Sequence, residues 1–146
     1  MLGEFPSVSG SPEETERAGA ALAAVLGPGD VVLVSGELGA GKTTFVRGAL
    51  RALGVSEEVT SPTFVVGILY DGAAGPVAHL DLYRLSGFEG EDPGLLDPYF
   101  GPDTVTFIEW PERVESAADL AGRAIARHVT LEHAGGDRRR IEVRGA

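Results

Sequence analysis

An eight-residue stretch in the first third of the chain combines the residue types that bind a phosphate. It reads G-E-L-G-A-G-K-T over residues 36–43 and fits the pattern G-x-x-x-x-G-K-[ST] at every fixed position. Glycines let the backbone curl so that successive N–H groups face an anion, and the positive end of a following helix adds to the attraction. We expect Lys42 to reach the β- and γ-phosphates of a nucleoside triphosphate and the Thr43 hydroxyl to ligate Mg²⁺. The residues predicted to bind the nucleotide at this loop are Gly36, Glu37, Leu38, Gly39, Ala40, Gly41, Lys42, Thr43 and Thr44.

Lysine usage favours this interpretation over a glycine-rich turn that matches the pattern by chance. Lys42 is the only lysine, and arginine supplies the other eleven of the 12 Lys and Arg residues. A compact ammonium and a planar guanidinium are not interchangeable, so this placement indicates that the loop needs an ammonium. The guanine-reading motif Asn-Lys-x-Asp is excluded, because the single lysine already stands in the loop. ATP is therefore the expected nucleotide.

Hydrolysis needs an acid at the end of a neighbouring strand, to hold Mg²⁺ or to position water. Two apolar segments end in an acid: residues 77–81 end at Asp81, and residues 105–109 end at Glu109. Ligands of open α/β sheets gather at the carboxyl ends of the strands, so both acids are predicted to face the nucleotide. Either acid could be the metal ligand beside Thr43 or the residue that positions water, and either could instead be a solvated strand end.

Other candidates carry a weaker signal. Thr63 follows Ser-Pro in the connection after the predicted loop helix, and it could offer its hydroxyl to Mg²⁺ or water or be an ordinary turn residue. Trp110, the only tryptophan, follows Glu109 directly, so it is expected either near the site or in the core. The three histidines show no metal-ligand spacing, and structural roles are favoured for His79, His128 and His133. The arginine run at 138–140 follows Gly-Gly-Asp and favours a hairpin leading into an edge strand over an RNA contact.

Composition limits the class of protein. A length of 146 residues suits one domain, predicted to span residues 1–146. The net charge of −10, from 22 acidic and 12 basic residues, opposes a large face for tRNA or DNA. No apolar run reaches membrane length and residues 1–5 lack a signal-peptide layout, so we expect no membrane contact and a cytoplasmic location. Without cysteine, disulfides and thiolate catalysis are excluded.

The elements that position these residues follow from the apolar pattern. A capping serine at 11, proline at 12 and glutamate at 14 begin a helix, whose predicted apolar stripe is Ala18, Ala21, Leu22, Val25 and Leu26 and which Gly-Pro-Gly at 27–29 ends. A buried strand at 31–34, the loop and a helix at 42–53 follow, with Gly54 as the cap residue. Strands at 63–70 and 76–83 flank a short turn, so they must be antiparallel.

The second half of the chain is predicted less regularly. Residues 86–103 indicate an irregular connection with one short helical turn, and residues 104–108 indicate a buried strand. A helix over 116–126 and a hairpin of 128–133 with 140–144 complete the chain. The expected fold class is α/β: a single P-loop NTPase domain whose mixed sheet, parallel plus antiparallel, is flanked by helices.

Four segments together resemble the bacterial TsaE family. They are G-E-L-G-A-G-K-T-T-F at 36–45, S-P-T-F at 61–64, H-L-D-L-Y-R-L at 79–85 and I-E-W-P at 108–111. The first motif is generic, whereas His-x-Asp-x-Tyr-Arg and Glu-Trp are particular to this family. The resemblance implies Thr43 and Glu109 as magnesium ligands, Asp81 and Thr63 on the γ-phosphate side, and Trp110 beside the site.

The resemblance also implies partners. The TsaE family is the ATPase component of the bacterial system that makes threonylcarbamoyladenosine beside the tRNA anticodon. The implied partners are the transferase TsaD and its inactive paralogue TsaB, with tRNA contacted only through the complex. ATP binding and hydrolysis would reset that complex between rounds, which agrees with the acidic charge.

Two other classes stay open. A small-molecule P-loop kinase also has about this length, but it needs an acceptor pocket and usually an arginine-rich lid, whereas the arginines here are scattered. A nucleotide-sensing module without hydrolysis would leave Asp81 and Glu109 without a catalytic role. The accessory ATPase is the favoured interpretation.

Overall fold

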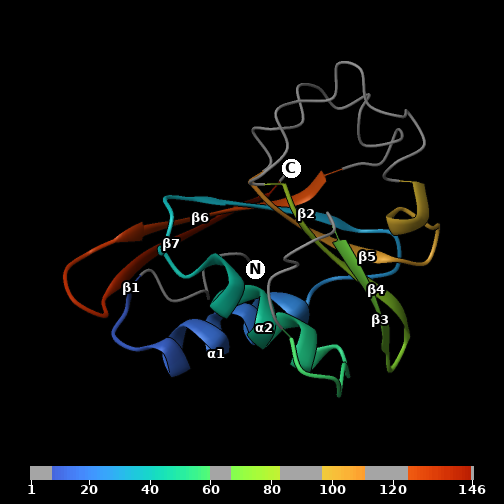
Figure 1. Cartoon of the computed structure of the whole chain (residues 1–146), viewed down its shortest axis with the longest axis horizontal. Helices are drawn as coiled ribbons and strands as arrows, with labels where there is room; N and C mark the ends of the chain where they lie inside the picture. Colours follow the sequence, from blue (N-terminus) through green and yellow to red (C-terminus); the bar gives the residue numbers. More distant parts are fainter. Residues whose placement is uncertain (1–7, 60–66, 83–96, 111–124, 146) are drawn as a thin grey trace.

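A seven-stranded mixed sheet organises the fold (Figure 1). The computed structural model describes residues 8–59, 67–82, 97–110 and 125–145. Its strand order is β1-β7-β6-β2-β5-β4-β3, with β6, β2, β5 and β4 parallel and the flanking pairs antiparallel. The strands are β1 (Val8–Ser9), β2 (Val31–Gly36), β3 (Gly67–Gly72), β4 (Gly75–Asp81), β5 (Val105–Glu109), β6 (Ile125–His133) and β7 (Arg139–Gly145). The predicted α/β class and the mixed sheet are confirmed.

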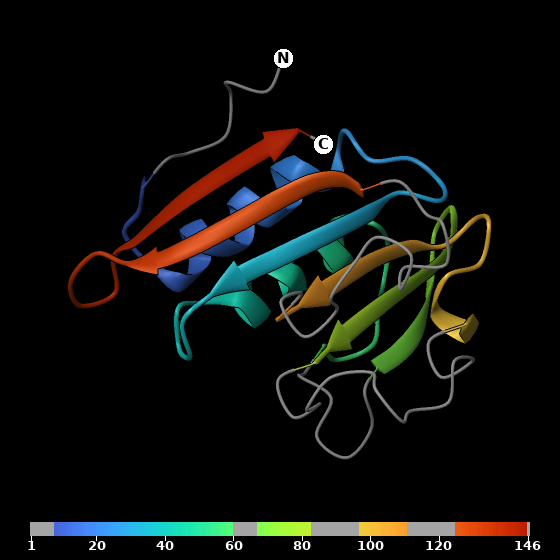
Figure 2. The same ribbon diagram turned by 90° about the horizontal axis from the view of Figure 1, so that it is seen from above.

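Two helices, α1 (Pro12–Ala23) and α2 (Lys42–Ala52), lie side by side on one face of the sheet (Figure 2). Between them and the sheet lies the larger apolar core, to which α2 contributes Phe45, Val46, Ala49 and Leu50. A second, smaller cluster of buried side chains comes from β2, β4, β5 and the segments next to β4 and β5. It contains Val31, Leu80, Leu82, Phe100 and Ile108. Residues of β2 belong in turn to one cluster and then the other, because successive side chains of a strand point to opposite faces of the sheet.

The helices touch closely because each has a glycine at the contact. A Cβ built on Gly48 would lie 1.9 Å from the carbonyl oxygen of Glu16, and one built on Gly19 would lie 2.0 Å from that of Phe45. Any larger side chain at these positions would push the helices apart. This contact fixes the position of α2, and therefore of the loop at its amino end.

Helix α1 begins as predicted and ends early. The Ser11 hydroxyl accepts a hydrogen bond from the Glu14 N–H at 3.2 Å, while the Glu14 carboxylate accepts one from the Gly10 N–H at 2.8 Å. The predicted extension to Gly-Pro-Gly is wrong, since Val25 and Leu26 donate to Leu22 and Ala23 through tighter i→i−3 bonds. Ala21 lies on the exposed face of α1 and Val25 lies beyond its end, so both are exposed, unlike the predicted stripe.

The carboxyl-terminal hairpin of β6 and β7 is confirmed, but its setting differs from the prediction. Ile125 and Ala126, expected at the end of a helix, begin β6, while residues 116–124 lie outside the described part. Strand β6 pairs in parallel with β2, so the hairpin reaches into the sheet. Strand β7 is not an edge at Arg139 and Arg140, because β1 pairs with both.

The remaining predictions agree where the structure describes them. Strands β3 and β4 are antiparallel across a two-residue turn, and the short helical turn is a 3₁₀ helix, η2 (Asp97–Tyr99). Residues 63–66 and 86–96 lie outside the described residues. No helix within the described ranges is long and apolar enough to cross a membrane.

Candidate functional site

The loop between β2 and α2 has the backbone conformation that anion binding requires. Gly39 (φ 79°) and Gly41 (φ 98°) are left-handed, a conformation that other residues rarely adopt. Gly41 is also the N-cap of α2, and no side chain caps this end of the helix. The first N–H groups of α2 are therefore available to donate hydrogen bonds to an anion, and the positive end of the helix dipole adds to the attraction.

Lys42 is held at the mouth of this loop. Its Nζ donates to the carbonyl oxygens of Gly36 and Glu37, both at 2.7 Å, and only 5% of the residue is exposed. The ring of Trp110 lies over the same ammonium, with the centroid 4.1 Å from Nζ. Trp110 therefore lies at the loop, and it also packs against the smaller core cluster, so both sequence-based expectations for this residue apply.

Trp110 reaches that position through an unusual backbone. Its φ of 61° is the one positive value among the described non-glycine residues. For a bulky residue this conformation costs on the order of 1–3 kcal/mol. The Trp110 N–H donates to the Val34 carbonyl at 3.2 Å, which ties the turn after β5 to β2. The strained turn directs the indole toward Lys42.

Thr43 and Glu109 meet directly. The Thr43 hydroxyl donates to Glu109 Oε2 at 2.8 Å, and Glu109, at the end of β5, is 2% exposed. Asp81, half-buried at the end of β4, stands in register with Glu109, so the two acids lie next to each other on neighbouring strands. Both predicted acids therefore lie at the carboxyl ends of their strands, on the side of the sheet where α2 begins.

His79 also belongs to this site, although its sequence context favoured a structural role. Its Nε2 lies 2.6 Å from Glu109 Oε2, and the side chain is completely buried. The sequence could have indicated this position for His79. His79 and Asp81 are two residues apart on one strand, so their side chains lie on the same face of the sheet. Metal-ligand spacing did not reveal this residue, because the contact that places it at the site is with the acid Glu109.

The β6–β7 hairpin also reaches the loop. Arg139 Nη2 donates to the Gly39 carbonyl at 3.2 Å, and His133 Nε2 lies 3.4 Å from the Leu38 carbonyl. Both contacts link residues about a hundred positions apart, and no sequence pattern pointed to them. The arginine run is part of a hairpin, as favoured, and one of its members also supports the loop. Thr63 lies outside the described residues.

The residues present suit Mg²⁺ shared with a nucleotide. A hydroxyl and a carboxylate, the ligand types that Mg²⁺ prefers, meet where the phosphate-binding amides begin. The described residues contain no group of three or more His, Cys, Asp or Glu side chains that could hold a metal alone. Mg²⁺ typically takes one or two protein ligands and completes its shell with water and phosphate oxygens.

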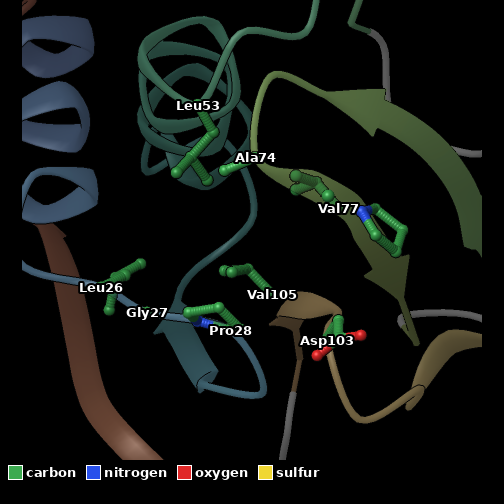
Figure 3. A pocket seen from close by; sticks show the side chains of 10 residues that line it. Leu26, Gly27, Pro28, Leu53, Ala74, Val77, Asp103 and Val105 are labelled. Atoms are coloured by element: carbon green, nitrogen blue, oxygen red, sulfur yellow. The ribbon is translucent and has the colours of Figure 1, made fainter.

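A hollow lies away from this edge of the sheet (Figure 3). It is lined by residues Leu26, Gly27, Pro28, Leu53, Ala74, Gly75, Pro76, Val77, Asp103 and Val105. Val77 and Val105 lie near the starts of β4 and β5, whereas the loop is at the carboxyl ends of the parallel strands. With apolar walls and one acid, Asp103, this hollow does not suit a polyphosphate.

The fold and the loop together define a single α/β P-loop domain. A family model described as "Threonylcarbamoyl adenosine biosynthesis protein TsaE" matches residues 9–141. The chain belongs to the TsaE family, as its four motifs suggested.

Individual relatives agree with this membership. A protein of Bacillus subtilis named "tRNA threonylcarbamoyladenosine biosynthesis protein TsaE" is 39% identical over 131 residues, which cover 90% of this chain and 79% of that protein. A protein of the same name from Treponema pallidum is 43% identical over 110 residues, covering 75% and 80%. The crystal structure of YdiB from Bacillus subtilis superposes with a TM-score of 0.63 at 34% identity, covering 92% of this chain and 80% of that one.

Proposed function

We propose that this chain is the Mg²⁺-dependent, ATP-hydrolysing subunit of the bacterial system for threonylcarbamoyl modification of the tRNA adenosine next to the anticodon. The observation that carries the proposal is the 2.8 Å hydrogen bond from Thr43, directly after the loop lysine, to the buried carboxylate of Glu109. An acid beside the loop threonine is the arrangement by which P-loop proteins hold the Mg²⁺ that accompanies a nucleoside triphosphate. The names of the relatives supply the reaction in which the subunit would take part.

Binding of the phosphates would fall to the loop amides and Lys42. The ammonium already stands at the loop mouth, where it donates to two carbonyl oxygens that phosphate oxygens could replace as acceptors. Trp110 covers part of the ammonium and keeps water from it, which strengthens its attraction to a phosphate.

Thr43 and Glu109 would hold the metal, and Asp81 would position the attacking water. Mg²⁺, when bound, neutralises charge on the β- and γ-phosphates and fixes their orientation. Glu109 is fully buried and bonded to Thr43, which suits a ligand whose geometry must not vary. Asp81 is more exposed, which suits a residue that contacts water. Thr63 remains a candidate for the γ-phosphate side.

The proposed partners are TsaD and TsaB, with tRNA contacted only through the complex. Support comes from charge: a chain of net charge −10 is repelled by a polyanion but can act on a protein complex. The names of the relatives also favour this function over a small-molecule kinase.

The test is ATP hydrolysis by the purified chain with Mg²⁺, alone and then with TsaD, TsaB and tRNA. We expect a basal rate that Lys42→Ala abolishes and that the partners change. Arg51→Ala is the matched control, since it removes an exposed cation from the same helix without touching the loop. Turnover unaffected by Lys42→Ala would contradict the site. ADP formation that responds to a small-molecule acceptor and not to the partners would favour the kinase.

A further inference from the structure

His79 stands behind the proposed metal ligand. It lies on β4 with no exposed surface, and its Nε2 is 2.6 Å from Glu109 Oε2. A carboxylate that ligates Mg²⁺ only accepts hydrogen bonds, so the proposed role of Glu109 requires that Nε2 of His79 carries the hydrogen. Oε2 thus accepts two hydrogen bonds, one from His79 on β4 and one from Thr43 on α2. The two donors come from different elements and meet on one oxygen.

The second ring nitrogen of His79 points to a role beyond packing. Nδ1 is buried and has no hydrogen-bond partner within the described residues. A buried histidine kept only for stability normally satisfies both nitrogens, because an unpaired buried polar atom costs free energy. The one described polar contact of this ring is Glu109. The side chain therefore carries an energetic cost that its contact with Glu109 must offset.

Glutamate needs such a contact more than aspartate does. P-loop NTPases commonly hold Mg²⁺ with an aspartate, whereas this chain has the longer Glu109 at the proposed position. The extra rotatable bond lets a carboxylate swing, and Mg²⁺ demands near-ideal octahedral geometry. A donor fixed in the sheet next to Glu109 removes that freedom.

We propose that His79 is a positioning residue that fixes the Glu109 carboxylate against Thr43 for Mg²⁺ binding. This inference rests on the proposed Mg²⁺–ATP function and deepens it. His79 does not touch the nucleotide or the metal: it acts through Glu109, as partners of metal ligands commonly do. Loss of such partners typically weakens metal affinity about 10- to 100-fold.

Two substitutions separate this role from simple packing. The side-chain amide of glutamine can present its nitrogen where His79 has Nε2, whereas the shorter asparagine presents it where His79 has Nδ1. His79→Gln should therefore keep the hydrogen bond to Glu109, and His79→Asn should lose it. His128→Asn is the matched control, because His128 is a strand histidine bonded to Ser35 Oγ at 3.1 Å.

The quantity measured is the Mg²⁺ affinity of the protein in the presence of ADP. Mg²⁺ is added stepwise, and the fluorescence of the single tryptophan, Trp110, reports binding. We expect His79→Asn to raise the half-saturating Mg²⁺ concentration about 10-fold or more, and His79→Gln to raise it less than about threefold. ADP affinity without metal should stay within about twofold, since Glu109 does not bind the phosphates directly. Equal impairment by both substitutions, or no change with His79→Asn, would overturn the inference.

A second measurement needs no variant and covers the case in which His79→Asn fails to fold. Two-bond ¹H–¹⁵N spectra of the metal-free wild-type protein report which histidine nitrogen carries hydrogen. We expect Nε2 of His79 to be protonated, and a hydrogen on Nδ1 alone would overturn the inference. If the wild-type protein shows no Mg²⁺-dependent change with ADP, the proposed function fails and this inference with it. A wild-type response that His79→Asn leaves unchanged overturns this inference alone.

Discussion

The Thr43 hydroxyl and the Glu109 carboxylate lie 2.8 Å apart, and this contact joins the first turn of α2 to the end of β5. The residues are 66 positions apart in the chain. Their contact joins two elements that each fold for local reasons, and it forms the proposed metal-binding position.

Glu109→Gln tests the role of the acid. The amide keeps the shape of the side chain but removes the charge that Mg²⁺ and the reaction need. We expect turnover to fall by at least about 100-fold, while ADP binding without metal is retained. Mg²⁺-dependent hydrolysis and ADP titration measure the two effects. Glu132→Gln on the exposed part of β6 is the control, and it should hydrolyse ATP like the wild-type protein.

The contact between Trp110 and Lys42 predicts a graded series. Trp110→Phe keeps an aromatic face over the ammonium, and Trp110→Ala removes it. We expect a cation–π loss of about 1–2 kcal/mol at this partly desolvated site, which corresponds to roughly 5- to 30-fold weaker ADP binding for the alanine variant. Calorimetric titration measures the affinity. If the phenylalanine and alanine variants weaken ADP binding equally, the cation–π contact with Lys42 does not contribute to ADP affinity.

Arg139→Ala should loosen the loop without removing any proposed phosphate ligand. The lost hydrogen bond to Gly39 is worth about 0.5–1.5 kcal/mol, so ADP affinity should fall roughly 2- to 10-fold. Arg140→Ala is the matched control: it removes the neighbouring charge, which is 66% exposed and pairs with Glu132 instead. Equal losses in both variants would indicate a general charge effect, which added salt would screen.

Gly48→Ala tests the close contact of the helices. The new methyl group would lie 1.9 Å from the Glu16 carbonyl, so α1 and α2 must separate. Overpacking of this kind costs about 1–3 kcal/mol, which for a domain of this size lowers the midpoint of thermal unfolding by roughly 2–12 °C. Gly27→Ala, which meets nothing within 4 Å, should leave the midpoint almost unchanged. Circular dichroism melting curves compare the two.

The sequence by itself determined the phosphate loop, the capped start of α1 and the two acids at strand ends. These features depend on residues that are close together in the chain: glycines at 39 and 41 for the curl, Ser11 for the cap, and an apolar run before each acid. Such patterns act through backbone conformation and burial of a single element, so they can be recognised before the fold is known.

Only the tertiary structure decided which side chains support the site. The contacts of His79 with Glu109, of Trp110 with Lys42 and of Arg139 with Gly39 all cross between elements. They depend on the register of β4 against β5, on the strained turn at Trp110 and on the parallel pairing of β6 with β2. A period of two or 3.6 residues predicts which face a side chain takes, but it carries no information about the neighbour that packing brings there.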